Sequence, residues 1–139
     1  AEVDPDEYYA LSRETYRRSD IPGPRRRTVR RLHRFLAARY KALFSGVYVD
    51  GALKAASIIP YHGGHAFYLY GASSSDRSDK SGNATSYLHY ENMRTLRGRG
   101  VRDYDFGGAT LTTEKGKSLA EFKRGFGGAE IQCYGGILR

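Results

Sequence analysis

Two short glycine-containing motifs near the carboxyl end of the chain carry the side chains best suited to chemistry. They lie about 14 residues apart and read Tyr104-Asp105-Phe106-Gly107-Gly108 and Phe122-Lys123-Arg124-Gly125-Phe126-Gly127. The ammonium of Lys123 could stabilise a developing negative charge, and the carboxylate of Asp105 could accept a hydrogen bond from an amine. Residue types of this kind suit a reaction in which negative charge develops on an oxygen atom.

The same residues also have structural interpretations. A strand end followed by Gly107 and Gly108 suits a ligand crevice, but the two glycines could equally serve a sharp turn alone. Asp105 could tie down the loop, and the sequence slightly favours that role. Phe122 and Phe126, four residues apart, fit a core better than a site. Lys123 could be a surface lysine on an amphipathic helix.

Other candidate residues carry weaker signals. His62, His65 and His89 lack the spacing of metal ligands on a helix, so the sequence predicts no metal site. Cys133 is the only cysteine, which excludes an internal disulfide and fits a small buried residue. A single cysteine is compatible with a reducing, cytoplasmic location. No apolar run approaches the length of about 18 residues that a membrane span needs.

Positive charge is concentrated in one segment. Eleven Lys or Arg stand between Arg13 and Lys41 against two acids, whereas the formal charge of the whole 139-residue chain is +8. Such a density favours a polyanion such as RNA, a pyrophosphate or an anionic lipid head group. A solvated helix face is an equally good interpretation. The candidate nucleic-acid contacts are Arg25, Arg26, Arg27, Arg30, Arg31 and Arg34.

Two helices are expected to open the chain. Asp4 and Pro5 suit a cap and a first turn, so we predict a helix from about Pro5 to Arg18. Ile21-Pro22-Gly23-Pro24 stops it. A second helix is predicted from about Arg25 to Leu43. Its apolar stripe consists of Val29, Leu32, Leu36, Tyr40 and Leu43.

An antiparallel meander of three strands follows. The strands are predicted at Phe44–Val49, Ala52–Tyr61 and His65–Gly71. Asp50-Gly51 forms the first turn and His62-Gly63-Gly64 the second. A polar loop from Ser73 to Gly82 then leads into the next helix.

The last third of the chain alternates helices and strands. A helix capped by Ser81 or Asn83 should run to about Arg99. Its apolar positions are Ala84, Tyr87, Leu88, Tyr90, Met93 and Leu96. The later elements are a strand at Val101–Phe106, a short helix at Ser118–Arg124 and a strand at Ala129–Leu138. The order is α-α-β-β-β-α-β-α-β. The helical crossover predicts that the third and fourth strands run parallel, in a mixed sheet with helices on both faces.

This element order and the two motifs resemble the GNAT-like acyltransferase fold, and specifically the Fem-type aminoacyl-tRNA-dependent peptidyltransferases. The resemblance covers about Tyr8 to the end and also includes Phe67–Ser73 and the helix ending in Arg99-Gly100. It implies one GNAT-like domain over residues 1–139, similar to the second of the two domains in full-length members. The strand that normally precedes the first helix is expected to be missing. A second GNAT-like domain or another copy of the chain could complete the assembly.

The resemblance also implies an activity. Fem-type enzymes take an aminoacyl group from a charged tRNA and transfer it to an amine, usually on a peptidoglycan-precursor peptide. By this resemblance Lys123 and Asp105 are the catalytic candidates, because the matching lysine binds the tRNA end and stabilises developing charge. The implied substrate-binding residues are Tyr104, Phe106, Gly107, Gly108, Phe122, Arg124 and Gly127. No cofactor is expected.

An acyl-CoA enzyme of this fold would need a glycine-rich turn before the helix that starts near Asn83. Main-chain amides and the helix N-terminus would cradle the pyrophosphate there. This chain has Ser74 to Gly82 instead, with one glycine and with Asp76 and Asp79, which would repel phosphate. The departure argues for a tRNA-borne donor. An acyl-CoA N-acyltransferase and a non-catalytic domain that binds tRNA or protein remain the alternatives.

Overall fold

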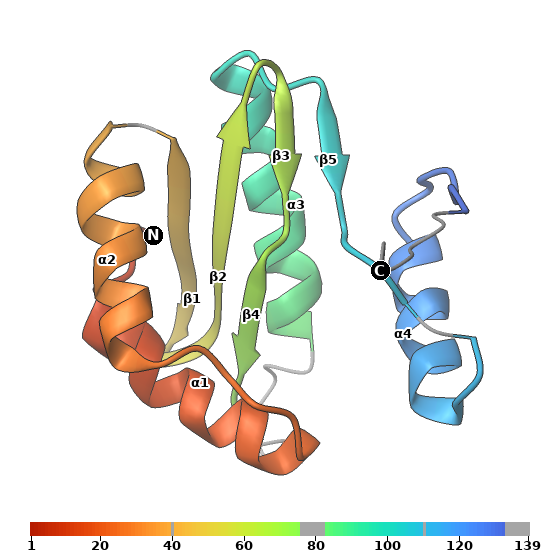
Figure 1. Cartoon of the computed structure of the whole chain (residues 1–139), viewed down its shortest axis with the longest axis horizontal. Helices are drawn as coiled ribbons and strands as arrows, with labels where there is room; N and C mark the ends of the chain where they lie inside the picture. Colours follow the sequence, from red (N-terminus) through yellow and green to blue (C-terminus); the bar gives the residue numbers. More distant parts are fainter. Residues whose placement is uncertain (40, 76–82, 110, 133–139) are drawn as a thin grey trace, which may run out of the picture. The chain divides into compact units, whose positions relative to one another are not determined.

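The computed structural model describes residues 1–39, 41–75, 83–109 and 111–132 (Figure 1). The chain divides into two compact units, Ala1–Asp105 and Phe106–Arg139. The first unit holds the sheet and three α-helices, and the second holds one short helix.

The first unit begins with two helices, α1 (Pro5–Ser19) and α2 (Arg26–Leu36). The carboxylate of Asp4 accepts hydrogen bonds from the amides at positions 6 and 7, at 2.8 and 3.4 Å, which confirms the predicted start of α1. The predicted end of α2 at Leu43 is wrong. A short 3₁₀ turn, Ala37–Arg39, follows α2, and Leu43 belongs to a strand. The position of Leu43 fits the spacing of a helix and also that of a strand, and its pairing with a neighbouring strand makes it part of the first strand.

A long antiparallel hairpin forms the centre of the sheet. Strand β1 (Ala42–Val49) pairs with β2 (Ala52–His62) along its whole length. Asp50 and Gly51 have φ angles of 51° and 77°, the positive values that this tight turn needs, as the sequence predicted. At the outer edge of β1, the amide of Gly46 donates to the carbonyl of Ala1 at 2.8 Å. Residues 1–3, which precede the first helix, thus lie along the edge of β1. The sequence predicted that a full strand is missing at this point, and these residues form an isolated bridge, Glu2 to Ser45.

The predicted third strand is divided in two. Strand β3 (His65–Phe67) pairs with the end of β2, and β4 (Tyr70–Ser73) pairs with the middle of β2. Strand β5 (Asp103–Asp105) runs parallel to β3, which confirms the predicted parallel crossover. Both strands pair with β2, but the register shifts by one residue between them, because residues 67–69 face only residues 59 and 60 of β2.

Helices cover both faces of this sheet, as predicted (Figure 1). Ile58 and Ile59 are both fully buried, but they belong to different clusters because neighbouring side chains in a strand point to opposite faces. Ile58 packs with Tyr8 of α1 and Val29 of α2. Ile59 packs with Leu96 of α3 (Ala84–Gly98). No helix among the described residues has the length and apolar character to cross a bilayer.

The apolar stripe predicted for α3 is wrong at two positions. Tyr87 and Tyr90 are 54% and 56% exposed, whereas His89 and Asn92 are 2% and 1% exposed. The burial follows hydrogen-bond partners rather than hydropathy, because the sheet beneath α3 offers hydroxyl groups to both polar residues.

The second unit contains α4 (Glu114–Arg124). This helix begins four residues before the prediction, because the hydroxyl of Thr113 caps it by accepting a bond from the Gly116 amide at 3.1 Å. Residues 129–132 form no strand, so the predicted strand Ala129–Leu138 is wrong over that part. Its remainder lies outside the described residues, as do Tyr40, Cys133 and residues 76–82 of the polar loop.

Candidate functional site

The outer edge of β4 lies against α1 in the first unit. The pairing register places Gly71 opposite Ser57 and Ser73 opposite Ala55. The main-chain amide of Ser74 donates to Lys54 in β2 at 2.8 Å, so the polar groups of Ser73, one residue earlier, face away from β2. Unpaired strand edges need partners, and the edge of β4 finds them in α1.

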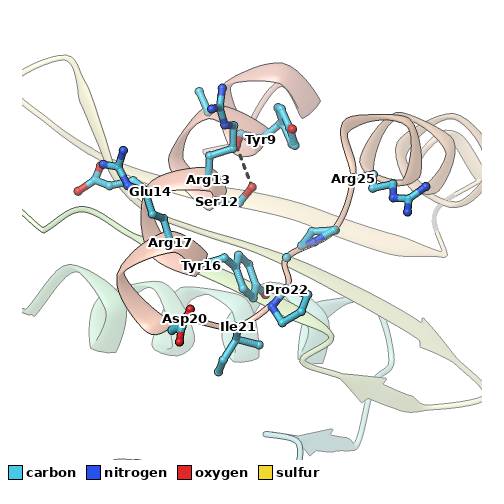
Figure 2. Close-up of a pocket in the computed structure, with 13 residues that line it drawn as sticks. Tyr9, Ser12, Arg13, Glu14, Tyr16, Arg17, Asp20, Ile21, Pro22 and Arg25 are labelled. Atoms are coloured by element: carbon cyan, nitrogen blue, oxygen red, sulfur yellow. Dashed lines mark hydrogen bonds between the residues drawn. The ribbon is translucent and has the colours of Figure 1, made fainter.

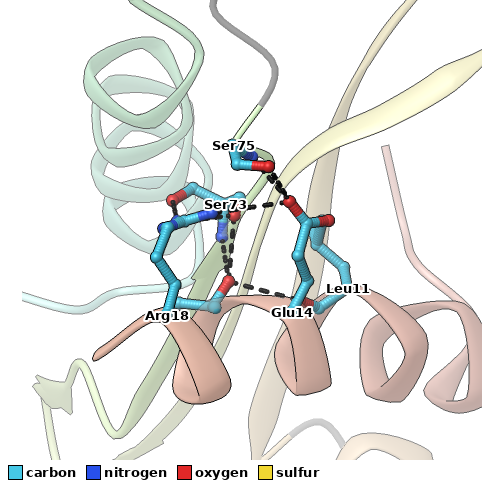
Figure 3. A network of polar contacts seen from close by, with 6 residues as sticks. Leu11, Glu14, Arg18, Ser73 and Ser75 are labelled. Carbon is cyan, nitrogen blue, oxygen red and sulfur yellow. Dashed lines mark hydrogen bonds and ion pairs between the residues drawn. The ribbon is translucent and has the colours of Figure 1, made fainter. Parts of the chain in front are cut away.

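Helix α1 holds the end of β4 through side chains (Figure 3). The amide of Ser73 donates to the Thr15 hydroxyl at 2.9 Å, and that hydroxyl lies 2.9 Å from the Ser73 carbonyl. Arg18 donates to the same carbonyl at 3.1 Å. Glu14 accepts hydrogen bonds from the amide and the hydroxyl of Ser75, which lower the pKa of the Glu14 carboxyl. The start of the polar loop is therefore fixed to α1.

A tyrosine lies directly under the edge of β4. A Cβ atom added to Gly71 would stand 1.7 Å from the phenol oxygen of Tyr68, so only glycine leaves room for this ring. The ring of Tyr68 lies 4.6 Å from that of His89 in α3, measured between centroids. Burial raises the pKa of Tyr68, so its hydroxyl stays protonated at neutral pH.

Tyr104, a predicted substrate-binding residue, is turned toward α3. Its hydroxyl lies 2.9 Å from Nδ1 of His89, and burial raises its pKa. Asp105, the next residue in β5, is exposed. Alternation along the strand separates the two predicted site residues onto opposite faces. Tyr104 therefore positions α3 against the sheet, whereas Asp105 is the member of the pair that solvent can reach.

A buried polar triangle beside these aromatic residues was not predicted. The hydroxyl of Ser45 donates to Oδ1 of Asn92 at 2.6 Å, and Nδ2 of Asn92 donates to the Ser57 hydroxyl at 3.0 Å. The two serine hydroxyls lie 2.9 Å apart and close the triangle. All three residues are less than 9% exposed. The signal available in the sequence was the pair of serines inside two otherwise apolar strands.

In the second unit, the two sequence motifs meet at Lys123. Its ammonium donates to the carbonyl oxygens of Gly107 and Gly108 at 2.9 and 2.8 Å. Gly107 has a φ of 76°, a backbone conformation that favours glycine. Lys123 of α4 thereby fixes the conformation of the double-glycine loop, and its positive charge is held against that loop.

Of the other predicted site residues in this unit, the phenylalanines pack together and Arg124 forms an ion pair. Phe106, Phe122 and Phe126 form an aromatic cluster, with centroid distances of 5.1 and 5.3 Å from the Phe126 ring. Arg124 pairs with Glu130 at the surface. Gly127 has a φ of 78° and ends the turn after α4. Phe122 and Phe126 thus pack against each other and are half-buried.

The predicted nucleic-acid-binding arginines fall into two groups. Arg26 and Arg30 both bond to the carboxylate of Asp6 in α1, at 2.6 to 3.0 Å, and these bonds hold the pKa of Asp6 well below its usual range. The remaining four are exposed and have no ion pair within the described chain. They are Arg25, Arg27, Arg31 and Arg34. The side chains at 27, 31 and 34 share one face of α2 by helical spacing.

The described residues contain no cluster of three or more His, Cys, Asp or Glu side chains that could hold a metal ion. His65 and Asp103 form an exposed pair at 2.9 Å across β3 and β5. Two groups are too few for a protein metal site.

The chain is similar in sequence to a known protein family and to known enzymes. Residues 2–124 match the family described as the acetyltransferase (GNAT) domain. The lipid II:glycine glycyltransferase of Staphylococcus haemolyticus is 37% identical over 86 residues, which cover 60% of this chain and 19% of that protein. The Staphylococcus aureus enzyme of the same name is 36% identical over 84 residues, 60% of this chain and 18% of its own. The match thus spans about a fifth of the length of these relatives.

Solved structures show the same fold at low identity. An aminoglycoside N-acetyltransferase in complex with CoA superimposes with a TM-score of 0.69 and 12% identity, over 97% of this chain and 88% of its own. The PaiA N-acetyltransferase of Thermoplasma acidophilum in complex with coenzyme A gives a TM-score of 0.62 and 14% identity, over 86% and 82% of the two chains. At such identities the likeness concerns the fold alone.

Proposed function

This chain belongs to the acetyltransferase (GNAT) domain family. On that premise we propose that it is a Fem-type aminoacyltransferase or a domain of one. The reaction moves an aminoacyl group from aminoacyl-tRNA to an amine of a peptidoglycan-precursor peptide. The observation that carries the proposal is the bond from Lys123 to Gly107 and Gly108, which joins the two motifs of the family resemblance. The partial identity with lipid II:glycine glycyltransferases supports the acceptor class.

The proposed chemistry is attack of a neutral amine on the ester carbonyl of the charged tRNA. The new C–N bond forms first and gives a tetrahedral intermediate; its collapse breaks the ester C–O bond, and the ribose hydroxyl leaves with the proton that the amine gives up. Lys123 stabilises the oxyanion of the tetrahedral intermediate, where a fixed positive charge acts without reorganisation. Asp105, exposed at the end of β5, accepts a hydrogen bond from the amine and orients it.

The four arginines without ion pairs supply the contact with the tRNA backbone. Arg27, Arg31 and Arg34 present one unneutralised stripe on α2, which suits a row of phosphates. Arg26 and Arg30 contribute less, because Asp6 already neutralises part of their charge. The relatives are about five times as long as the matched segment, which leaves room for a second GNAT-like domain as a partner.

The test uses the complete protein with glycyl-, alanyl- and seryl-tRNA as donors and lipid II as acceptor. We expect a mass increase of the acceptor by one aminoacyl residue with at least one donor. Acetyl-CoA with the same acceptor serves as the matched alternative donor. Acetyl transfer without any aminoacyl transfer would reject the proposal in favour of an acyl-CoA enzyme.

A further inference from the structure

A cavity in the first unit shares no lining residue with the motifs described above. It has a volume of about 950 Å³ and is bounded by one face of α1 and by the turn from Asp20 to Arg25 (Figure 2). Its wall combines two tyrosines with three arginines. They are Tyr9, Tyr16, Arg13, Arg17 and Arg25. Spacings of three and four residues bring the helical members of this set onto one side of α1.

The aromatic wall of the cavity is held rigidly. A Cβ atom added to Gly23 would lie 2.7 Å from the Tyr16 ring, so the main chain of the turn packs directly on that ring. Pro22 and Pro24 flank this glycine and restrict the backbone on either side. The cavity is therefore formed before a ligand arrives, and a planar group could stack there with little loss of conformational entropy.

The charged side chains of the cavity differ in whether they already have a partner. Arg13, Arg17 and Arg25 form no ion pair or hydrogen bond through their side chains within the described chain. Glu14 is occupied by Ser75 and Arg18. Of the two acids in the lining, Asp20 is therefore the one with no ion pair among the described residues, and it lies at the opposite end of the turn from Arg25 in Figure 2.

We propose that this cavity binds one nucleotide of a single-stranded RNA. The phosphates contact Arg13, Arg17 and Arg25, the base stacks on Tyr16, and Asp20 accepts a hydrogen bond from an exocyclic amino group of the base. Adenine, cytosine and guanine carry such a group and uracil does not. Arg25 also stands beside the start of α2, so the strand continues along Arg27 and Arg31. The inference rests on the proposed function for its RNA partner, but the binding itself can be measured without any transfer reaction.

The experiment measures binding of fluorescein-labelled tetranucleotides of A, C and U to the complete protein by anisotropy at several salt concentrations. We expect oligo(A) and oligo(C) to bind roughly tenfold or more tightly than oligo(U), as the loss of a base contact implies. The double variant Arg13→Ala/Arg17→Ala should lower the slope of log K against log salt by about 1.4, because each phosphate contact on a single strand contributes about 0.7.

Two controls separate this site from general charge. Arg97→Ala removes an exposed arginine from the last turn of α3 and should leave binding unchanged. Asp20→Asn should reduce the preference for A and C over U while it preserves the fold, which the melting temperature checks. Equal binding of oligo(U), an unchanged salt slope in the double variant, or full competition by inorganic pyrophosphate would each overturn the assignment. Aminoacyl transfer with normal kinetics beside any of these results would leave the proposed function standing and remove the cavity from it.

Discussion

The hydroxyl of Thr15 lies 2.9 Å from both main-chain polar groups of Ser73, so one helical side chain completes the hydrogen bonding of a strand edge. The Thr15 hydroxyl accepts from the amide and donates toward the carbonyl. This contact joins α1 to the end of β4 over the point where the predicted polar loop begins.

Replacing Thr15 by valine should destabilise the first unit by about 1–2 kcal/mol, because the half-buried amide of Ser73 loses its acceptor. Thr15→Ser keeps the hydroxyl and should cost less. Urea unfolding of the complete chain measures both variants. Equal stability of the valine and serine variants would show that the hydroxyl contributes nothing.

Asn92→Ala should cost about 2–4 kcal/mol, because it leaves the hydroxyls of Ser45 and Ser57 buried without their amide partner. Thr95→Ala, an exposed position on the same helix, is the matched control and should change stability by less than about 0.5 kcal/mol. Thermal unfolding followed by circular dichroism makes the comparison. A loss no greater than that of the control would contradict a structural role for the triangle.

Gly71→Ala should disturb the fold through a single collision with Tyr68, whose phenol oxygen would lie 1.7 Å from the new Cβ. We expect the alanine variant to lose about 1–3 kcal/mol, the usual cost of overpacking. In a Tyr68→Leu background the same substitution should cost clearly less, because the ring is absent. Additive losses in the double variant would show that the two residues do not interact.

Asp6→Asn should lower stability at neutral pH, because Arg26 and Arg30 lose the carboxylate that they share. These bonds lower the pKa of Asp6 in the folded state, so their contribution is present above the unfolded pKa of about 3.9. It is lost as the pH falls below that value toward the depressed folded pKa. The difference in melting temperature between the two proteins should therefore shrink on acidification. A difference that stays constant from pH 7 to pH 2 would exclude this ion pair as its cause.

Lys123→Met should reduce kcat of aminoacyl transfer by about 10²–10³, the usual effect of removing an oxyanion-stabilising group. The substitution keeps an unbranched side chain, shorter by one atom, and removes the ammonium that bonds to Gly107 and Gly108. Lys117→Met, also in α4, is the control and should retain activity. Wild-type kcat in the Lys123 variant would restrict this lysine to a structural role.

Local signals in the sequence were sufficient for much of the fold. Asp4 and Asp50 act through their immediate neighbours, so the helix start and the hairpin turn could be predicted from a few residues. The parallel pairing of β3 with β5 followed from a general rule about helical crossovers. The interruption of the predicted third strand between β3 and β4 could not be predicted, because it depends on a one-residue shift in its pairing with β2.

For the candidate site, the sequence indicated which residues to consider but not what surrounds them. Lys123 and the double glycine were identified, but their direct bond depends on how the loop folds back onto α4. His89 and Asn92 are buried because residues of distant strands form hydrogen bonds with them. Hydropathy alone instead predicts tyrosines on the buried face of α3. The division of the arginines by Asp6 likewise depends on the packing of α1 against α2.

The pairing of β3 with β5 also has a consequence for the order of folding. The hairpin of β1 and β2 closes through a two-residue turn, and β3 follows β2 through another tight turn. By contrast, residues 65–67 meet residues 103–105 only after the whole segment between them has been brought back across the sheet. Closing that distant contact carries the larger entropic cost, so we expect β5 to dock last. In pulse-labelled hydrogen exchange, the amide of Tyr68, which donates to the Asp105 carbonyl at 2.8 Å, should gain protection later than the amides of β1.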